Sequence, residues 1–316
     1  MSITPEFDVA IIGGGAAGYS AALYASRASL RAVVLEQGMP GGQIATTADV
    51  DNYPAIPMIS GAELGDKFQK HAESAGAITR TASVGALEPK EDGSFLIKTN
   101  SDELEVPAVI LAMGASPRPG GFEGEDAFRG RGISYCATCD AMFYRGKDVY
   151  VIGGGNTACE DALYLARVAN SVTMVLRRDV FRATRNLVER VLAHDKIKVR
   201  YLTSIVSVGG EGLISEISFK NNTDDVVSTE QVEPGSTGIF VATGYLPKTD
   251  LVEGLLELAP DGGITTNDAM ATSIPGLFAA GDIRSKRLRQ VITAAADGAI
   301  AGSSAYTYLE ESGQLS

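Results

Sequence analysis

Short, uninterrupted apolar runs recur along the chain, and glycines follow most of them. Val9–Ile12 precedes three consecutive glycines, and Val149–Ile152 precedes three more. An apolar run of roughly four to eight residues bounded by turn residues is typical of a strand buried on both faces of a parallel sheet. The same pattern predicts further buried strands within residues 109–114, 239–244 and 275–282.

The first of these runs opens a strand–turn–helix–strand unit. The alanine-rich residues 16–28 predict a helix, and residues 31–36 predict the second strand. The turn has the G-x-G-x-x-G spacing of dinucleotide-binding folds. In that turn the first glycine permits the tight bend, the second lets a pyrophosphate approach the backbone, and the third lets helix and strand pack closely. These glycines are Gly13, Gly15 and Gly18.

The residues around this turn are suited to contact a nucleotide. The start of a helix offers free N–H groups and a positive dipole end to phosphates. Glu36 closes the second strand, where a carboxylate can accept both hydroxyl hydrogen bonds of an adenosine ribose. A structural glycine turn without a ligand is the alternative, but strand, helix and terminal acid are all present. We therefore expect a nucleotide at Gly13, Gly15, Ala16, Ala17, Gly18 and Glu36.

The same pattern returns about 140 residues later. Residues 149–158 repeat the strand and the turn, and Ala22-Leu-Tyr24 in the first helix recurs as Ala162-Leu-Tyr164. Such a repeat predicts two Rossmann-like nucleotide sites in one chain. The second site would include Gly153, Gly155, Asn156, Thr157 and Ala158.

The second site departs from the first at the end of its second strand. Leu176 stands where the first site has Glu36, and arginines follow it. A ribose that carries a 2′-phosphate would repel a carboxylate and attract guanidinium groups, which grip phosphate in a bidentate fork. Arg177, Arg178 and Arg182 therefore predict NADP(H) at the second site. A solvated helix face is the alternative for the basic residues nearby, which are Arg185, Arg190, Lys196, Lys198 and Arg200.

Length and charge narrow the functional classes. The 316 residues suffice for about two domains. The net charge of −12 makes nucleic acid an unexpected partner, because phosphate backbones repel an acidic protein. No apolar run is long enough to span a membrane. The first eight residues hold two acids and no Lys or Arg, which argues against a secretory signal, so we expect a cytoplasmic protein.

The order of the apolar runs indicates how the domains are connected. The segments 109–114 and 239–244 resemble crossovers between two domains. The second nucleotide fold would then be inserted into the first. We expect one discontinuous domain of residues 1–115 and 245–316, and a second domain of residues 116–244.

The last strand and the helix that follows it add candidate ligands to the first domain. Residues 275–282 predict a buried strand that ends in Gly281-Asp282, and residues 291–311 predict a helix. An Asp beside a glycine at a strand end can bond a ribityl hydroxyl or a pyrophosphate-bound water. The dipole at the helix start, around Gln290–Thr293, could stabilise the negative charge of a reduced flavin ring.

Cys136-Ala-Thr-Cys139 precedes the second nucleotide strand, and it is best interpreted as a redox pair. Zinc would need four ligands, and beyond the pair the chain offers only Cys159, His71 and His194, so we expect no metal. A static disulfide across two residues would constrain little of the unfolded chain. A short, reducible disulfide remains. Asp140 could move protons for it, with a helix N-cap as the alternative, and Cys159 is expected to be a packed core thiol.

Together these residues resemble the low-molecular-weight, bacterial-type thioredoxin reductases along essentially the whole chain. Larger disulfide reductases carry a Cys-x4-Cys soon after the first nucleotide turn, whereas residues 41–47 here contain no cysteine. The motifs that carry the resemblance are Gly13–Gly18, Gly41–Gln43, Asp51–Pro54, Cys136–Asp140, Gly153–Ala158, Arg177-Arg178 with Arg182, Gly281-Asp282 and Arg289-Gln290.

The resemblance implies an α/β fold of two Rossmann-like domains of the three-layer ββα type. It implies FAD in the discontinuous domain and NADPH in the inserted one. It further implies that Cys139 faces the flavin, that Cys136 attacks the disulfide of thioredoxin, and that the protein is a homodimer. Beyond the first turn and Glu36, the implied FAD contacts are Gly41, Gly42, Gln43, Asn52, Gly114, Gly281, Asp282, Arg289, Gln290 and Val291.

Two positions depart from the family pattern. Leu176 replaces a His that is usual before the paired arginines, and Ala141-Met142 replaces the usual Gly-Phe after the Asp. The first departure bears on the preference for NADPH, and the second on the redox loop. A related dithiol oxidase that uses oxygen and needs no NADPH is one alternative function, and the intact second turn argues against it. A redox sensor without turnover is another.

Overall fold

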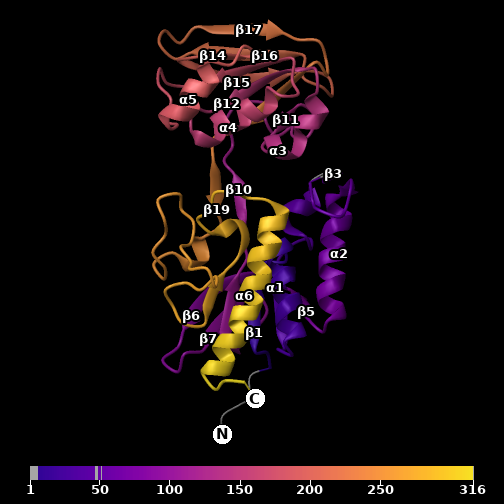
Figure 1. Cartoon of the computed structure of the whole chain (residues 1–316), viewed down its shortest axis with the longest axis vertical. Helices are drawn as coiled ribbons and strands as arrows, with labels where there is room; N and C mark the ends of the chain where they lie inside the picture. The colour runs from indigo at the N-terminus through magenta and orange to yellow at the C-terminus, as the bar shows by residue number, and fades with distance from the viewer. Residues whose placement is uncertain (1–5, 47–48, 51, 316) are drawn as a thin grey trace. The chain divides into compact units, whose positions relative to one another are not determined.

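The computed structural model of the chain describes residues 6–46, 49–50 and 52–315. Of the expectations above, those for residues 1–5, Thr47 and Asp51 lie outside the described residues. The chain folds into two compact units. One comprises Met1–Ser116 and Leu246–Ser316, and the other comprises Pro117–Tyr245 (Figure 1).

The first unit is built on a five-stranded parallel sheet in the order β20-β9-β1-β2-β5. Alternate residues of β1 face opposite layers. Val9 and Ile11 pack toward the helices, and Ala10 and Ile12 pack toward a three-stranded antiparallel sheet. The parallel strands are β1 (Val9–Ile12), β2 (Ala32–Glu36), β5 (Ile78–Thr81), β9 (Ala108–Leu111) and β20 (Leu277–Ala279). The other layers comprise α1 (Ala16–Arg27), α2 (Gly61–Ser74), α6 (Val291–Glu311), β6 (Val84–Pro89), β7 (Phe95–Thr99) and β8 (Glu103–Val106).

The second unit repeats this three-layer plan. Its parallel sheet has the order β11-β18-β12-β13-β14, with helices on one side and a three-stranded antiparallel sheet on the other. The ββα architecture expected for two Rossmann-like folds is thus confirmed. The parallel strands are β11 (Ile133–Ser134), β12 (Asp148–Ile152), β13 (Ser171–Val175), β14 (Ile197–Arg200) and β18 (Thr237–Val241). The remaining elements are α3 (Ala137–Asp140), α4 (Asn156–Leu165), α5 (Arg185–Leu192), β15 (Thr203–Gly209), β16 (Glu216–Asn221) and β17 (Val227–Gln231).

Small residues allow α6 to lie directly against α1 (Figure 1). A Cβ atom on Gly298 would stand 2.1 Å from the carbonyl oxygen of Ala17, and one on Gly302 would stand 2.4 Å from that of Ala21. Gly281 makes a similar approach, since a Cβ there would lie 2.8 Å from the Cβ of Ala17. The C-terminal segment is therefore held beside the start of α1, where the first glycine turn lies.

The expected crossovers need a correction. Residues 109–114 and 239–244 hold β9 and β18, which are strands inside the sheets of the two separate units. The chain passes between the units just after these strands. Its two connections, β10 (Ala115–Pro117) and β19 (Tyr245–Pro247), pair with each other as a two-stranded sheet. Among the described residues, no helix is long and apolar enough to cross a membrane.

Candidate functional site

In the first turn, the first and third glycines are required by the protein's own backbone. Gly13 has φ +105°, and a Cβ there would lie 2.6 Å from the carbonyl oxygen of Ala112. A Cβ on Gly18 would lie 1.8 Å from the carbonyl oxygen of Gly13. Gly15 differs, because the nearest atom to its Cβ position is the Gly41 oxygen at 3.9 Å. The second glycine thus leaves open space beside the helix start, which is where the motif admits a pyrophosphate.

Glu36 ends β2 directly beside this turn. Its Oε2 accepts a hydrogen bond from the backbone N–H of Gly14 at 2.6 Å, and its Oε1 accepts one from that of Gly38 at 2.7 Å. A carboxylate has about four lone-pair positions, so two remain for hydroxyl donors. The structure therefore places the carboxylate at the turn as the sequence predicted, and it adds that the same group holds the turn in shape.

Residues distant in sequence complete the surroundings of the first turn. The backbone N–H of Gly41 donates to the carbonyl oxygen of Gly14 at 2.7 Å, which brings Gly41 and the adjoining 3-10 turn η1 (Gly42–Thr46) to the turn. Asn52 Nδ2 donates to Gln290 Oε1 at 3.0 Å, although these residues stand 238 positions apart. Among the other predicted contacts, Ala16 and Ala17 lie buried in the first turn of α1, Gln43 lies in η1, and Gly114 follows β9 with φ +72°.

Asp282 is a partly buried acid with one unused acceptor. Its Oδ1 is buried and has no hydrogen-bond partner within the described chain. Burial raises the pKa of its carboxyl group to about 6. It lies in the short turn η4 (Gly281–Ile283), just after β20. An unsatisfied buried acceptor costs free energy, and a hydroxyl group of a ligand would relieve that cost.

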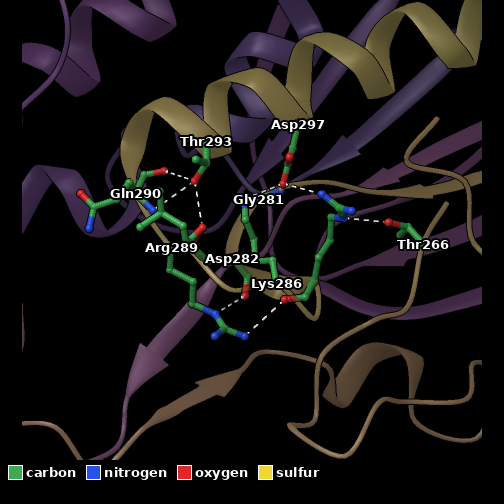
Figure 2. Close-up of polar contacts among 10 residues, drawn as sticks. Thr266, Gly281, Asp282, Lys286, Arg289, Gln290, Thr293 and Asp297 are labelled. Carbon is green, nitrogen blue, oxygen red and sulfur yellow. Dashed lines mark hydrogen bonds and ion pairs between the residues drawn. The ribbon is translucent and has the colours of Figure 1, made fainter. Parts of the chain in front are cut away.

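Arg289 and Gln290 fix the start of α6 (Figure 2). Arg289 Nε donates to the backbone oxygen of Asp282 at 3.3 Å, and its Nη2 contacts Asp261 Oδ2 at 3.2 Å. Gln290 forms a capping box with Thr293, so the helix begins at Val291. The three predicted residues 289–291 thus adjoin Asp282 at one helix end.

Sequence reasoning missed three charged residues close to Gly281 and Asp282. Asp297, buried in α6, accepts from the backbone N–H of Gly281 at 3.1 Å and forms ion pairs with Arg284 and Lys286 (Figure 2). An acid in an alanine- and glycine-rich helix is a signal that could have drawn attention to Asp297. Its cationic partners could not have been identified without the fold.

The open space and the hydrogen-bond acceptors of the first unit fit a flavin dinucleotide. Gly15 leaves room at a helix start for a pyrophosphate, Glu36 offers acceptors for a ribose, and the orphan oxygen of Asp282 offers one more for a polyol chain. Each of these groups is matched to a different part of the same extended ligand.

The second turn repeats the geometry of the first. Gly153 has φ +141°, and a Cβ there would lie 2.5 Å from the carbonyl oxygen of Ala242. Gly155 has no atom within 4 Å of its Cβ position, so the space for a phosphate is open here too. Asn156 Oδ1 accepts the backbone N–H of Thr184 at 2.8 Å. Thr157 is exposed in the first turn of α4, and Ala158 is fully buried.

The strand end beside the second turn carries cations instead of an acid. Leu176 is buried and fills the position over the turn, because a Cβ on Gly154 would lie 3.1 Å from its Cγ. The backbone N–H of Arg182 donates to the carbonyl oxygen of Gly154 at 2.7 Å. The side chains of Arg177, Arg178 and Arg182 are exposed, and none has an ion pair within the described part of the chain.

Nearby arginines behave differently. Arg185 pairs with Glu189 at 2.7 Å within α5, and Arg200 pairs with Glu230 at 2.6 Å across the antiparallel sheet. The charges of Arg185 and Arg200 are thus paired with carboxylates of the protein itself. The three arginines at the strand end are thus exposed guanidinium groups beside the second turn that could bind an anionic ligand.

The cysteine pair is a disulfide at the start of a short helix. Cys136 and Cys139 are bonded, with Cα atoms 5.3 Å apart, and both are partly exposed around α3. Buried Ser134 accepts the backbone N–H of Cys136 at 3.1 Å and donates to Asp140 Oδ2 at 2.6 Å. Asp140 occupies the N-cap position of the 3-10 turn η2 (Ala141–Tyr144) without a side-chain capping hydrogen bond to that turn, and its role in proton transfer stays a prediction.

A second polar contact holds the segment that leads into the disulfide. Glu125 is buried, and its carboxylate accepts the Tyr135 hydroxyl at 2.6 Å. It also accepts the backbone N–H groups of Gly120 and Gly121, both at 2.8 Å. The residue directly before Cys136 is thus bonded to a carboxylate that is itself held by two backbone N–H groups.

The third cysteine lies in the core. Cys159 is fully buried among the apolar residues around α4, and burial raises the pKa of its thiol to about 11. The expectation of a packed core thiol is confirmed. Within residues 6–46, 49–50 and 52–315, no group of three or more His, Cys, Asp or Glu side chains is arranged to hold a metal ion.

Comparisons with known proteins agree with this geometry. Residues 7–298 match the family model described as pyridine nucleotide-disulphide oxidoreductase. The thioredoxin reductase of Peptoclostridium litorale is 44% identical over 309 residues, which cover 96% of this chain and 98% of that protein. The thioredoxin reductase of Bacillus subtilis is 41% identical, with 98% and 97% coverage. The crystal structure of thioredoxin reductase from Streptococcus pyogenes superposes with a TM-score of 0.89 at 40% identity, covering 98% of this chain and all of that one.

Proposed function

The chain belongs to the thioredoxin reductases within the pyridine nucleotide-disulphide oxidoreductase family, and we propose that it carries electrons from NADPH through FAD to thioredoxin. It is a flavin- and pyridine-nucleotide-dependent oxidoreductase. The observation that carries the proposal is the Cys136–Cys139 disulfide in a chain with two open nucleotide turns. The overall reaction converts NADPH, a proton and a disulfide to NADP⁺ and a dithiol.

We assign FAD to the first unit. Open space at Gly15 supports the pyrophosphate position, the free acceptor positions of Glu36 support the ribose position, and the orphan oxygen of Asp282 supports a ribityl contact. FAD supplies a carrier that takes two electrons as hydride and returns them to a disulfide. Asn52 and Gln290, joined by a hydrogen bond, would line the same site at the start of α6.

We assign NADPH to the second unit. Gly155 leaves open space at the start of α4, and the exposed guanidinium groups of Arg177, Arg178 and Arg182, which form no ion pair with the described residues, match a 2′-phosphate. Leu176 is apolar and buried, so it places no negative charge beside that phosphate. The absence of a strand-end acid thus favours the phosphorylated nucleotide, even without a histidine before the arginines.

We propose that the cysteine pair reduces thioredoxin by thiol–disulfide exchange. After the disulfide has accepted two electrons, the Cys136 thiolate attacks one sulfur of the thioredoxin disulfide, and the other sulfur leaves as a thiolate. The Cys139 thiolate then attacks Cys136, which releases reduced thioredoxin and restores the Cys136–Cys139 bond. Asp140 and Ser134, joined at 2.6 Å, are placed beside the pair to hold and transfer the protons that the thiolates exchange.

The decisive experiment measures NADPH oxidation with dithionitrobenzoate as the acceptor, with and without thioredoxin from the same host. The proposal expects slow turnover without thioredoxin and a large, saturable increase with it. Sustained oxygen consumption with a small dithiol, without NADPH, would instead establish the dithiol oxidase. A single turnover with every acceptor would establish the redox sensor.

We also propose an oligomeric state and a cellular compartment for the protein. The family resemblance supports a homodimer, which sedimentation velocity of the flavin-loaded protein would test. The position of a reducible cysteine pair in an acidic chain supports the reducing cytoplasm. Fractionation of the host cells would test that assignment.

A further inference from the structure

A largely buried ion cluster adjoins Gly281, the residue next to the proposed flavin contact Asp282. Oxygen Oδ2 of Asp297 is shared by three donors, which are the Gly281 backbone N–H at 3.1 Å, Arg284 Nη1 at 2.9 Å and Lys286 Nζ at 2.7 Å (Figure 2). The side chains of Arg284, Lys286 and Asp297 are only 11–14% exposed. Thr266 fixes Arg284 further, because its hydroxyl oxygen accepts the Arg284 Nε–H at 2.7 Å.

The ion pairs of this cluster leave one positive charge in excess beside Gly281, the residue next to Asp282. Arg284 and Lys286 contribute two cations, and Asp297 contributes one anion. Arg289 has its own carboxylate, Asp261, at 3.2 Å. An unpaired buried cation is strongly unfavourable, so the remaining positive charge favours a second anion nearby. The charged form of Asp282 supplies it.

The ionisation of Asp282 decides what kind of ligand atom it can bind. An ionised carboxylate is only an acceptor, whereas a protonated one carries a donor hydrogen. Its Oδ1 is buried and without a partner in the described chain. The hydroxyl groups of a polyol chain can donate to such an oxygen, and a charged acceptor makes the stronger hydrogen bond.

We propose that Lys286, held in place by Asp297, is a positioning residue for the flavin nucleotide, which keeps the Asp282 carboxylate ionised and therefore accepting. This inference rests on the proposed FAD site. Asp297 acts as the anchor, because it binds both the lysine and the backbone of Gly281, the residue next to Asp282. Neither Lys286 nor Asp297 needs to touch the cofactor.

The electrostatic effects on Asp282 have opposite signs, which makes the proposal testable. Burial raises the pKa of the Asp282 carboxyl to about 6, Lys286 and Arg289 oppose this rise, and Asp297 adds to it. Removing the charge of Lys286 must therefore raise the pKa of Asp282 further. Removing the charge of Asp297 must not raise it. If the role of Lys286 were purely structural, its replacement would weaken FAD binding equally at every pH.

The experiment titrates the flavin-free full-length protein with FAD by calorimetry between about pH 5 and pH 9. Wild-type affinity should fall as the pH drops through about 6. In Lys286→Gln, which keeps a donor for Asp297 but loses the charge, the pH at the midpoint of this fall in FAD affinity should rise by about one unit. Since one unit corresponds to a tenfold change, affinity should be up to about tenfold weaker below pH 6 and within about twofold of wild type near pH 9.

Further variants isolate the cause. Lys286→Met should shift the midpoint as Lys286→Gln does, which covers the case in which one of the two fails to fold, and Lys286→Arg should restore the wild-type midpoint. Asp282→Asn should bind FAD more weakly with no midpoint in this range. Asp297→Asn keeps an amide oxygen that can accept from Lys286 and from the Gly281 N–H, so the midpoint should not rise, while the weaker, uncharged contacts should reduce FAD affinity at every pH. Lys67→Gln, on an exposed face of α2, is the matched control and should change nothing.

The outcomes separate the two proposals. A pH-independent loss in both Lys286→Gln and Lys286→Met, or no loss in either, would overturn the role of Lys286. Unchanged FAD affinity in Asp297→Asn would overturn its role as the anchor. If the wild-type protein itself failed to bind FAD, the proposed FAD site would fall, and this inference with it.

Discussion

The two nucleotide turns share one backbone plan but differ in how tightly each helix approaches its turn. In the first unit the third position is Gly18, and a Cβ there would collide with the Gly13 carbonyl oxygen at 1.8 Å. In the second unit the same position is Ala158, whose Cβ fits while the residue stays fully buried. The first position of the motif therefore requires glycine in both turns. At the third position, the size of the residue that fits depends on how closely the helix lies to the strand.

The larger difference stands at the strand end beside each turn. Glu36 holds the first turn through two backbone N–H groups, whereas Leu176 covers the second turn with an apolar side chain. Exposed arginines follow Leu176, and no acid stands at this position to play the part that Glu36 has in the first unit. The comparison teaches that the two units share the turn that we propose for phosphate binding, and that they differ at the strand end that we propose selects the nucleotide.

The disulfide is the sharpest contrast, since the cysteine pair belongs to the second unit alone. Cys136→Ser and Cys139→Ser should each abolish thioredoxin reduction, because exchange needs both sulfurs. Both variants should keep bound flavin, since the proposed FAD contacts lie in the other unit. Turnover with thioredoxin and the flavin absorbance of the purified variants test this. Cys159→Ala is the matched control and should retain turnover, and near wild-type activity in both serine variants would show that the pair is structural.

A substitution at the third position should destabilise the first turn more than the second. Gly18→Ala forces a Cβ into the Gly13 carbonyl, so we expect a loss of about 3 kcal/mol in the free energy of unfolding, with weaker flavin retention. Ala158→Gly removes one methyl group from a helix and should cost about 1 kcal/mol. Denaturant unfolding of the full chain, followed by flavin release, measures both. Equal costs for the two variants would contradict the difference in helix approach.

The arginines should set cofactor choice in the second unit only. Each guanidinium that binds the 2′-phosphate should contribute on the order of 1–3 kcal/mol. Arg177→Ala combined with Arg178→Ala should therefore raise the KM for NADPH about tenfold or more, since 1.4 kcal/mol corresponds to tenfold. NADH carries no such phosphate, so its low activity should stay constant.

A matched control separates recognition from general loss of charge. Arg185→Ala combined with Arg190→Ala removes two exposed cations from α5 and should leave both cofactors unaffected. Parallel titrations of NADPH and NADH on wild type and both double variants decide the matter. Equal losses for NADPH and NADH would assign Arg177 and Arg178 to the support of the fold.

The sequence alone determined the local features of both sites. Strand, turn and helix follow from residue periodicity and from glycines at fixed spacing, so both nucleotide turns and the helix 291–311 could be predicted. The change from Glu36 to Leu176 could be read by aligning the chain with itself. The cysteine spacing likewise indicated redox chemistry, because two residues between cysteines suit a disulfide.

Only the tertiary structure decided which distant residues meet. Asn52 reaches Gln290, Gly281 lies against Ala17, and Asp297 gathers its two cations, all because α6 packs on α1 through Gly298 and Gly302. No local pattern encodes such contacts, since they depend on how far one helix can approach another. The buried charges around Asp282 are set in the same way, because burial is a property of the packed unit and not of the residue.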